Sequence, residues 1–172
     1  MERSVFIDET SLKTNLVKTT GWAPVGKRLI DHAPFGHWHT QTFVAGLGHD
    51  GLIAPWVLDG AMNRESFDTC IQGQLAPALR PGQIVVADNL SSHKSTKAID
   101  LLRAQGNELI FLPPYSPDLN PLEMALSKLK TLIRKAAART YQALWQQVGA
   151  VCHLFQPQEC RNYSIAAGYG AN

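Results

Sequence analysis

Two short, continuous apolar runs in the second half of the chain most constrain its fold. They are Ile-Val-Val-Ala at 84–87 and Leu-Ile-Phe-Leu at 109–112, and such runs are typical of strands covered on both faces. Between them the sequence predicts a helix from His93 to Gln105, with Ser92 as its N-cap and Gly106 as its terminator. A strand, a helix and a strand in this order form a right-handed βαβ unit, so we expect an α/β sheet with helices on its faces.

Further elements are predicted on both sides of this unit. Pro55 places one of the preceding strands at an edge of the sheet. Residues after Pro157 are rich in Gly and Asn, and we expect this tail to fray. The other predicted strands span Val5 to Ile7, Lys27 to Ile30, His37 to Leu47 and Leu52 to Leu58. Three other helices are predicted: one spans Arg64 to Leu79 with Asn63 as its N-cap, one begins at Pro121 with Asn120 as its N-cap, and one follows Thr140.

Composition narrows the class of protein. The chain has 172 residues and a net charge of +2, which fit one globular domain and do not by themselves indicate a nucleic-acid binder. Cys70, Cys152 and Cys160 form no CxxC pair, so we expect no disulfide framework and a cytoplasmic location. The longest uncharged run, Thr140 to Gln158, contains five glutamines, so we expect no membrane span.

Three carboxylates stand where a site could form. Asp8 and Asp88 each follow an apolar strand, and Glu123 opens a helix just after a third strand. Active groups gather at strand ends in open α/β sheets. Three crowded carboxylates repel one another unless a cation offsets their charge. Mg²⁺ prefers oxygen ligands, and two such ions roughly 3.5–4 Å apart can clamp both the attacking and leaving oxygens of a phosphodiester.

Each of these carboxylates also has a purely structural interpretation. Glu123 falls three residues after Asn120, the spacing of a capping box. Asp8 can serve as a turn residue at a strand end, and Asp88 as part of a polar turn before a helix. Asp118 competes with Glu123 as the third ligand. Spacing alone leaves these alternatives open.

Three sequence blocks resemble a known family. They are FIDET at 6–10, VVADNLSSHKS at 85–95 and FLPPYSPDLNPLE at 111–123. These blocks resemble the signatures of DDE transposases, in particular the mariner-like insertion-sequence transposases of bacteria. The resemblance implies a ribonuclease-H-like α/β fold, a mixed sheet with helices on both faces. It also implies that Asp8, Asp88 and Glu123 are the catalytic, metal-binding triad, and 34 residues lie between the last two.

The resemblance carries further expectations about activity and partners. It implies DNA strand cleavage and strand transfer with two Mg²⁺ ions, with Asp8 bridging them and Mn²⁺ as a substitute. The implied partners are double-stranded DNA, as element ends and target, and a second copy of the chain in the DNA complex. We expect residues 1–156 to form the catalytic domain and 157–172 a C-terminal tail. We expect the family's N-terminal helix-turn-helix region to be absent from this chain. The chain would then be the second reading frame of a split transposase, with a separately encoded helix-turn-helix half, or the catalytic half of a fused product, or a truncated remnant.

Basic residues after the third block favour DNA binding. No acidic residue occurs from Met124 to Gln158. A basic helix beside an acidic metal site can hold the DNA backbone, although a solvated helix face is the plainer interpretation. A second basic surface is expected near Trp22. The candidates on the helix are Lys128, Lys130, Arg134, Lys135 and Arg139, and those of the second surface are Lys13, Lys18, Lys27 and Arg28.

Histidines give weaker signals. His93, beside Lys94, is predicted at a helix start that faces the site, where it would contact phosphate or a metal-bound water. The alternative for His93 is a surface histidine. His37 and His39 would share one face of a strand, but a metal site there needs further ligands.

Two other functions remain open at this point. A ribonuclease-H-like nuclease acting on hybrids or junctions would use the same three carboxylates. An inactive transposase remnant would bind DNA only, and would need no divalent cation.

Overall fold

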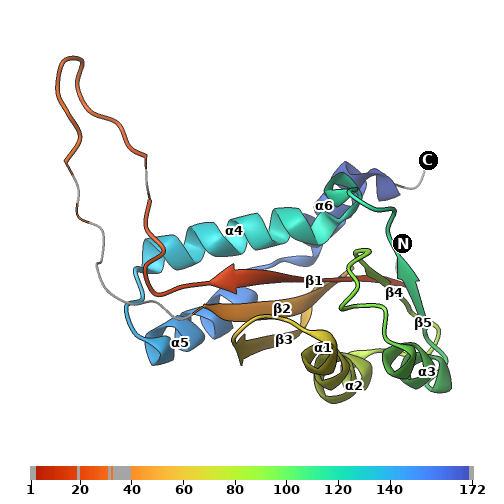
Figure 1. Cartoon of the computed structure of the whole chain (residues 1–172). Coiled ribbons are helices and arrows are strands. Elements are labelled where there is room, and N and C mark those ends of the chain that lie inside the picture. Colours follow the sequence, from red (N-terminus) through yellow and green to blue (C-terminus); the bar gives the residue numbers. More distant parts are fainter. Residues whose placement is uncertain (1–2, 19, 31, 33–39, 171–172) are drawn as a thin grey trace.

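A five-stranded mixed sheet forms the centre of the computed structural model, which describes residues 3–18, 20–30, 32 and 40–170 (Figure 1). The strand order is β3-β2-β1-β4-β5. β1 pairs antiparallel with β2 and parallel with β4, and β4 pairs parallel with β5. The predicted βαβ unit is therefore confirmed, as is the edge position of β3. The strands span Ser4–Leu12 (β1), Gln41–Gly48 (β2), Gly51–Asp59 (β3), Ile84–Ala87 (β4) and Glu108–Phe111 (β5).

Helices cover both faces of the sheet, as expected (Figure 1). No helix in the described parts of the chain is both long enough and apolar enough to cross a lipid bilayer. On one face lie α1 (Arg64–Cys70), the π-helical turn η1 (Ile71–Leu75), α2 (Ala76–Ala78) and α3 (Thr96–Ala104). On the other lie α4 (Pro121–Ala136), α5 (Tyr141–Cys152), α6 (Pro157–Ser164) and the closing turn η3 (Ile165–Tyr169), with the 3₁₀ turn η2 (Pro117–Leu119) leading into α4.

The side chains of β1 alternate between these two layers. Val5 and Ile7 are buried in the core against α1–α3, whereas Phe6 and Leu12 are buried in the core against α4–α6. Because successive residues of a strand point to opposite faces, the next two positions follow the same alternation. Asp8 therefore faces α4, and Glu9 faces the layer of α3.

Several predicted boundaries are wrong, each for a physical reason. β1 continues past Asp8 to Leu12 because its antiparallel pairing with β2 outlasts its pairing with β4. Lys27 to Ile30 form no strand, since this part of the β1–β2 connection is exposed and has no partner strand. α3 begins at Thr96 because Ser95, rather than Ser92, caps it through its hydroxyl oxygen, which accepts from the backbone N–H of Ala98 at 3.4 Å.

The expectation of a fraying tail is also wrong. Cys160 of α6 is fully buried against α4, and the amine of Lys128 donates to the carboxylate of Glu159 at 2.5 Å. Beyond α6, the ring centroid of Tyr169 lies 4.8 Å from that of Phe6. The Tyr169 hydroxyl donates to the carbonyl of Leu119 at 2.8 Å, so the tail supports the turn that leads into α4.

Replacing Glu159 by Gln tests this docking. Burial acts to raise the pKa of Glu159, but the Lys128 ammonium and the Tyr163 hydroxyl outweigh it and hold the pKa below its usual value of 4.5. A carboxyl with a lowered pKa in the folded state stabilises the protein above its unfolded-state pKa, and this contribution is lost as the pH falls. We expect Glu159→Gln to reduce the free energy of unfolding by about 1 kcal/mol at pH 7.

Urea unfolding at pH 7 and pH 3 measures this effect, and the difference should shrink at the lower pH. Asp100→Asn is the matched control, because Asp100 and its partner Arg103 are both more than 70% exposed. Equal stability of Glu159→Gln and the wild type at pH 7 would contradict the docking of α6 through this ion pair.

Candidate active site

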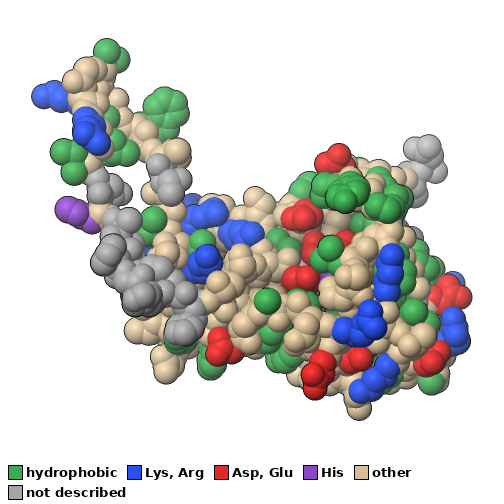
Figure 2. Space-filling view, in the orientation of Figure 1, with side chains coloured by type: hydrophobic (Ala, Val, Ile, Leu, Met, Phe, Trp, Pro, Cys, Tyr) green, Lys and Arg blue, Asp and Glu red, His purple; other side chains and the backbone are tan. Residues whose placement is uncertain are grey.

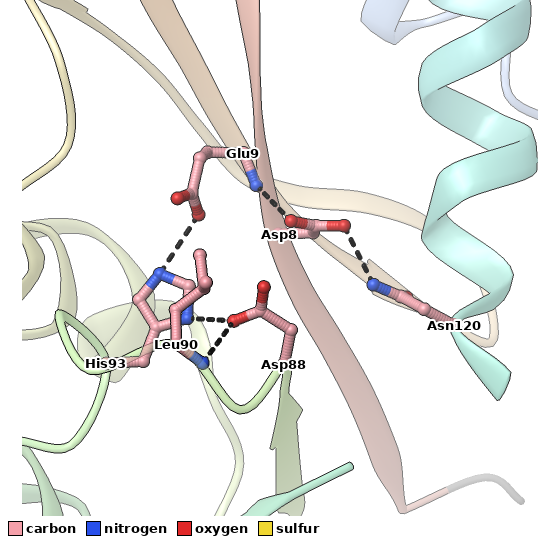
Figure 3. A network of polar contacts seen from close by, with 6 residues as sticks. All are labelled: Asp8, Glu9, Asp88, Leu90, His93 and Asn120. Atoms are coloured by element: carbon pink, nitrogen blue, oxygen red, sulfur yellow. Dashed lines mark hydrogen bonds and ion pairs between the residues drawn. The ribbon is translucent and has the colours of Figure 1, made fainter. Parts of the chain in front are cut away.

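Asp8 lies where the sheet opens between β1 and β4. The parallel pairing of these strands stops at Ile7 and Ala87, one residue before it. Its Oδ1 accepts the backbone N–H of Glu9 at 2.7 Å, and its Oδ2 accepts the Asn120 amide at 2.8 Å (Figure 3). The residue is only 8% exposed. Both oxygens are thus held in place by donors from two different elements.

Asp88 follows β4 directly, on the neighbouring strand. Its Oδ1 accepts the backbone N–H of Leu90 at 3.3 Å and also contacts Nδ1 of His93. The other oxygen points toward Asp8 (Figure 3). The Asp88 side chain is 34% exposed. One oxygen therefore anchors the side chain and the other is available to a ligand.

Asn120 connects Asp8 to the helix that carries Glu123. Its Oδ1 accepts the backbone N–H of Leu122 at 3.1 Å and so caps α4, while its amide nitrogen donates to Asp8. The predicted N-cap is confirmed. The backbone N–H of Asn120 donates to the Pro117 carbonyl at 2.9 Å, the bond that a capping-box carboxylate would otherwise take. Glu123 is exposed in the first turn of α4, free to serve another role.

The three predicted carboxylates meet at one open cavity of about 320 Å³. Asp8, Asp88 and Glu123 line it together with Asn120 and the Pro-rich turn after β5. Asp118, the competing candidate, is not part of the lining. The cavity therefore brings together side chains from a strand, a strand end and a helix start.

Electrostatic repulsion couples these carboxylates. Burial, above all, raises the pKa of Asp8 to about 7, and the charges of Glu9, Glu123 and Asp88 raise it further against the lowering effect of the Glu9 N–H. Within residues 3–18, 20–30, 32 and 40–170, no three acidic, His or Cys side chains stand close enough to form a ready-made metal site. The donor set nevertheless fits a hard divalent cation, which takes carboxylate oxygens and would offset the repulsion.

The structure places His93 in the protein interior rather than on a helix. Its side chain is 1% exposed, and its Nε2 lies 3.1 Å from the carboxylate of Glu9. Its ring stacks on Phe67 with 4.6 Å between centroids. Burial acts to lower the pKa of His93, but the carboxylates of Asp88 and Glu9 raise it to about 9. A side chain so buried does not reach a DNA phosphate, so the expected surface contact is not seen.

Sequence reasoning missed the contacts of Glu9 and the second role of Asn120. Glu9 stands next to Asp8 in a strand, so the alternation of side chains was the one signal that it faces another layer. Asn120 carried a clear capping signal, but nothing local indicated its bond to Asp8. His37 and His39 lie outside the described residues.

The basic candidates divide into two groups. Lys128 is engaged by Glu159 and by the Leu154 carbonyl, and the guanidinium of Arg139 donates to the carbonyls of Thr14 and Leu16. Arg139 also lies beyond the end of α4 at Ala136. These two side chains therefore serve the fold.

The other basic side chains remain accessible. Arg134 and Lys135 are exposed and line a groove of about 810 Å³ with Lys18 from the segment after β1. Lys130 is half-buried, and Lys94 is exposed. In Figure 2, Lys and Arg side chains gather where the β1–β2 connection meets α4, and acidic side chains lie toward the cavity.

Substitutions at Asn120 separate its two contacts. We expect Asn120→Ala to reduce the free energy of unfolding by about 1–2 kcal/mol, because α4 loses its cap. Asn120→Ser keeps a capping oxygen but loses the amide that reaches Asp8, so it should cost less than half as much. Urea unfolding of both variants measures the difference. Equal losses in both variants would show that the cap is not the stabilising contact.

Comparisons with known proteins agree with this architecture. No curated protein sequence matches the chain. The solved Mos1 strand transfer complex is 21% identical over 97% of this chain and 55% of the Mos1 chain, with a TM-score of 0.58. The Mos1 mariner paired end complexes with Mn and with Mg are 20% and 18% identical, each over 99% of this chain and 57% of theirs, with TM-scores of 0.56 and 0.57.

These likenesses confirm the expected ribonuclease-H-like fold, a mixed sheet with helices on both faces. The chain spans a little over half the length of those solved chains. A sequence profile described as DDE superfamily endonuclease matches residues 3–145, most of the chain. With the three carboxylates at one cavity, this match shows that the chain belongs to the DDE superfamily endonuclease family.

Proposed function

We propose that this chain is the catalytic domain of an insertion-sequence transposase that cleaves DNA strands and joins the freed ends to target DNA. The convergence of Asp8, Asp88 and Glu123 on one open cavity carries the proposal. The family match and the likeness to Mos1 complexes support it. A cavity open to solvent also suits a substrate as large as a DNA duplex.

Asp8, Asp88 and Glu123 would hold two Mg²⁺ ions, for which Mn²⁺ could substitute. The Mos1 paired end complexes with Mn and with Mg support divalent cations at this kind of site. When bound, such ions supply Lewis-acid stabilisation of charge on the phosphodiester oxygens. Asp88 and the exposed Glu123 both line the cavity.

The chain's own residues prepare the site in two ways. Asn120 and the Glu9 N–H hold both oxygens of Asp8, which limits its rotation at the opening between β1 and β4. Burial, above all, raises the pKa of Asp8 to about 7, and a cation bound beside it would favour its charged form. The Pro-rich turn after β5 lines the same cavity, and its prolines stiffen this part of the lining.

The DNA backbone is proposed to follow the basic side chains from the cavity along α4. Arg134, Lys135 and Lys18 share one groove, and Lys130 and Lys94 complete the proposed set. Lys128 and Arg139 are not included, because internal contacts engage them. Contacts of this kind position DNA without reading its sequence.

The proposed partners are double-stranded DNA, as element ends and target, and a second copy of the chain in the DNA complex. A separately encoded helix-turn-helix half that recognises the element ends is a further proposed partner. A cytoplasmic location is proposed from the cysteines, since Cys70, Cys152 and Cys160 are all free.

Replacing Asp88 by Asn tests the assignment of the site. The substitution keeps the size of the side chain but removes its charge, so we expect Mg²⁺-dependent strand cleavage to fall by about 10³-fold or more. DNA affinity should change little, and thermal melting checks that the variant, which loses the charge beside the buried His93, is folded at the assay temperature. The measurement is cleavage of a labelled duplex carrying the element end, with strand transfer to a second duplex followed in the same reaction.

Asp118→Asn is the matched control, because Asp118 neighbours the cavity in sequence but does not line it. Cleavage by Asp88→Asn at the wild-type rate would refute the metal site. Cleavage without strand transfer by the wild type would point to a hydrolase acting on hybrids or junctions, and DNA binding without cleavage would identify an inactive remnant.

Salt-dependent binding tests the basic groove. Each phosphate contact releases condensed counterions, so removing one reduces the slope of log affinity against log salt by about 1. We expect this loss for Lys135→Ala and for Arg134→Ala, equally on unrelated duplex sequences. Fluorescence anisotropy at several salt concentrations measures it. Arg103→Ala, an exposed residue of α3, should leave the slope unchanged, and an unchanged slope in all three variants would exclude the groove.

A further inference from the structure

His93 is among the most buried polar side chains of the described residues, and its contacts indicate a role besides packing in the core. Its imidazole lies in the loop between β4 and α3, enclosed against Phe67 and exposed by only 1%. Both of its nitrogens lie against carboxylates: Nδ1 against Asp88 and Nε2 against Glu9. A histidine that merely fills the core needs one partner, whereas two acidic partners constrain the ring from both sides.

The contact with Asp88 selects which of its oxygens stays free. His93 and the Leu90 N–H both engage Oδ1. The carboxylate is therefore fixed at one oxygen, and its other oxygen points toward Asp8 and the cavity (Figure 3). Without the ring, the Leu90 N–H at 3.3 Å would be the remaining anchor of Asp88, and the side chain could turn about its χ2 angle.

Glu9 fixes the ring in turn. It belongs to β1, as does Asp8, but faces the opposite layer. The chain of contacts Glu9–His93–Asp88 therefore passes from β1 through the layer of α3 to the end of β4 (Figure 3). Each ring nitrogen thus has a carboxylate beside it, and the two negative charges favour the protonated ring. The rigid framework of β1 thus determines the orientation of a side chain on another strand.

We propose that His93 is a positioning residue, anchored by Glu9, which holds the carboxylate of Asp88 in the orientation that binds a divalent cation. The inference rests on the proposed function, because it takes Asp88 as a metal ligand. Partners of this kind behind a metal ligand typically change metal affinity or activity by about 10–100-fold when they are removed.

Two amide substitutions test which nitrogen of the ring holds Asp88 in place. In His93→Asn the amide nitrogen lies near the place of Nδ1 and can still donate to Asp88, whereas in His93→Gln it lies near the place of Nε2 and is directed toward Glu9. Binding of Mn²⁺ to the full chain is followed by electron paramagnetic resonance of the free ion, below the melting temperature of each variant. We expect affinity to fall by about 10–100-fold in His93→Gln and His93→Ala. The loss should be smaller in His93→Asn, which keeps a donor for Asp88 but loses the contact with Glu9.

Glu9→Gln gives a second route to the same answer if substitution of the buried ring prevents folding. It leaves His93 in place and weakens its anchor, so we expect an intermediate loss of Mn²⁺ affinity. His49→Ala is the control, because His49 contacts Asp50 on a turn far from the cavity lining. The thermal melting of the control and of every variant is also measured, which separates lost stability from lost metal affinity.

The outcomes distinguish this inference from the proposed function. If the wild type binds Mn²⁺ and Asp88→Asn does not, the metal site stands, and His93 can be judged. If folded His93→Gln, His93→Asn and Glu9→Gln all bind Mn²⁺ as tightly as the wild type does, the positioning role is overturned, and His93 is a core histidine only. Tighter binding in His93→Ala would also overturn it, because His93 would then compete with the cation. Absence of Mn²⁺ binding by the wild type would refute the proposed function itself.

Discussion

The parallel pairing of β1 with β4 is the constraint on which the candidate site depends. The pairing runs from Ser4 and Ile84 to Ile7 and Ala87, and each strand then continues into an aspartate. Burial of these strands between two helical layers fixes their register, because a slip of one residue would turn the side chains that pack against one layer toward the other. Two carboxylates distant in the sequence are thereby placed side by side at the same opening of the sheet.

Two side chains, Asn120 and His93, connect the two aspartates to other elements of the fold. Asn120 caps α4 with one end of its amide and holds Asp8 with the other, so the helix that carries Glu123 is aligned with β1. His93 performs a comparable task on the other layer, between Glu9 and Asp88. Farther along α4 the charge changes sign at the groove of Arg134 and Lys135 (Figure 2). One helix thus connects an acidic cavity to a basic surface, an arrangement suited to a polyanionic substrate.

Local signals predicted the parts of this structure that local physics determines. The apolar runs at 84–87 and 109–112 gave the correct βαβ unit, and Asn120 gave the correct start of α4. Contacts across the fold were beyond such signals. Ser95, and not Ser92, caps α3 after a turn that buries His93. Cys160 and Tyr169 are held in the fold by partners on α4 and β1. The three carboxylates were identified from their places at two strand ends and a helix start, and the family resemblance favoured a metal site over the structural interpretations. The fold of the sheet then brings them to one cavity.

A crystal structure of the chain grown with Mn²⁺, with anomalous scattering recorded at the manganese edge, tests the central claim most directly. The account predicts anomalous peaks in the cavity, with oxygens of Asp8 and Asp88 as ligands and Glu123 completing the coordination. A cavity without such peaks at saturating Mn²⁺, or a manganese ion held only by other side chains, would contradict it.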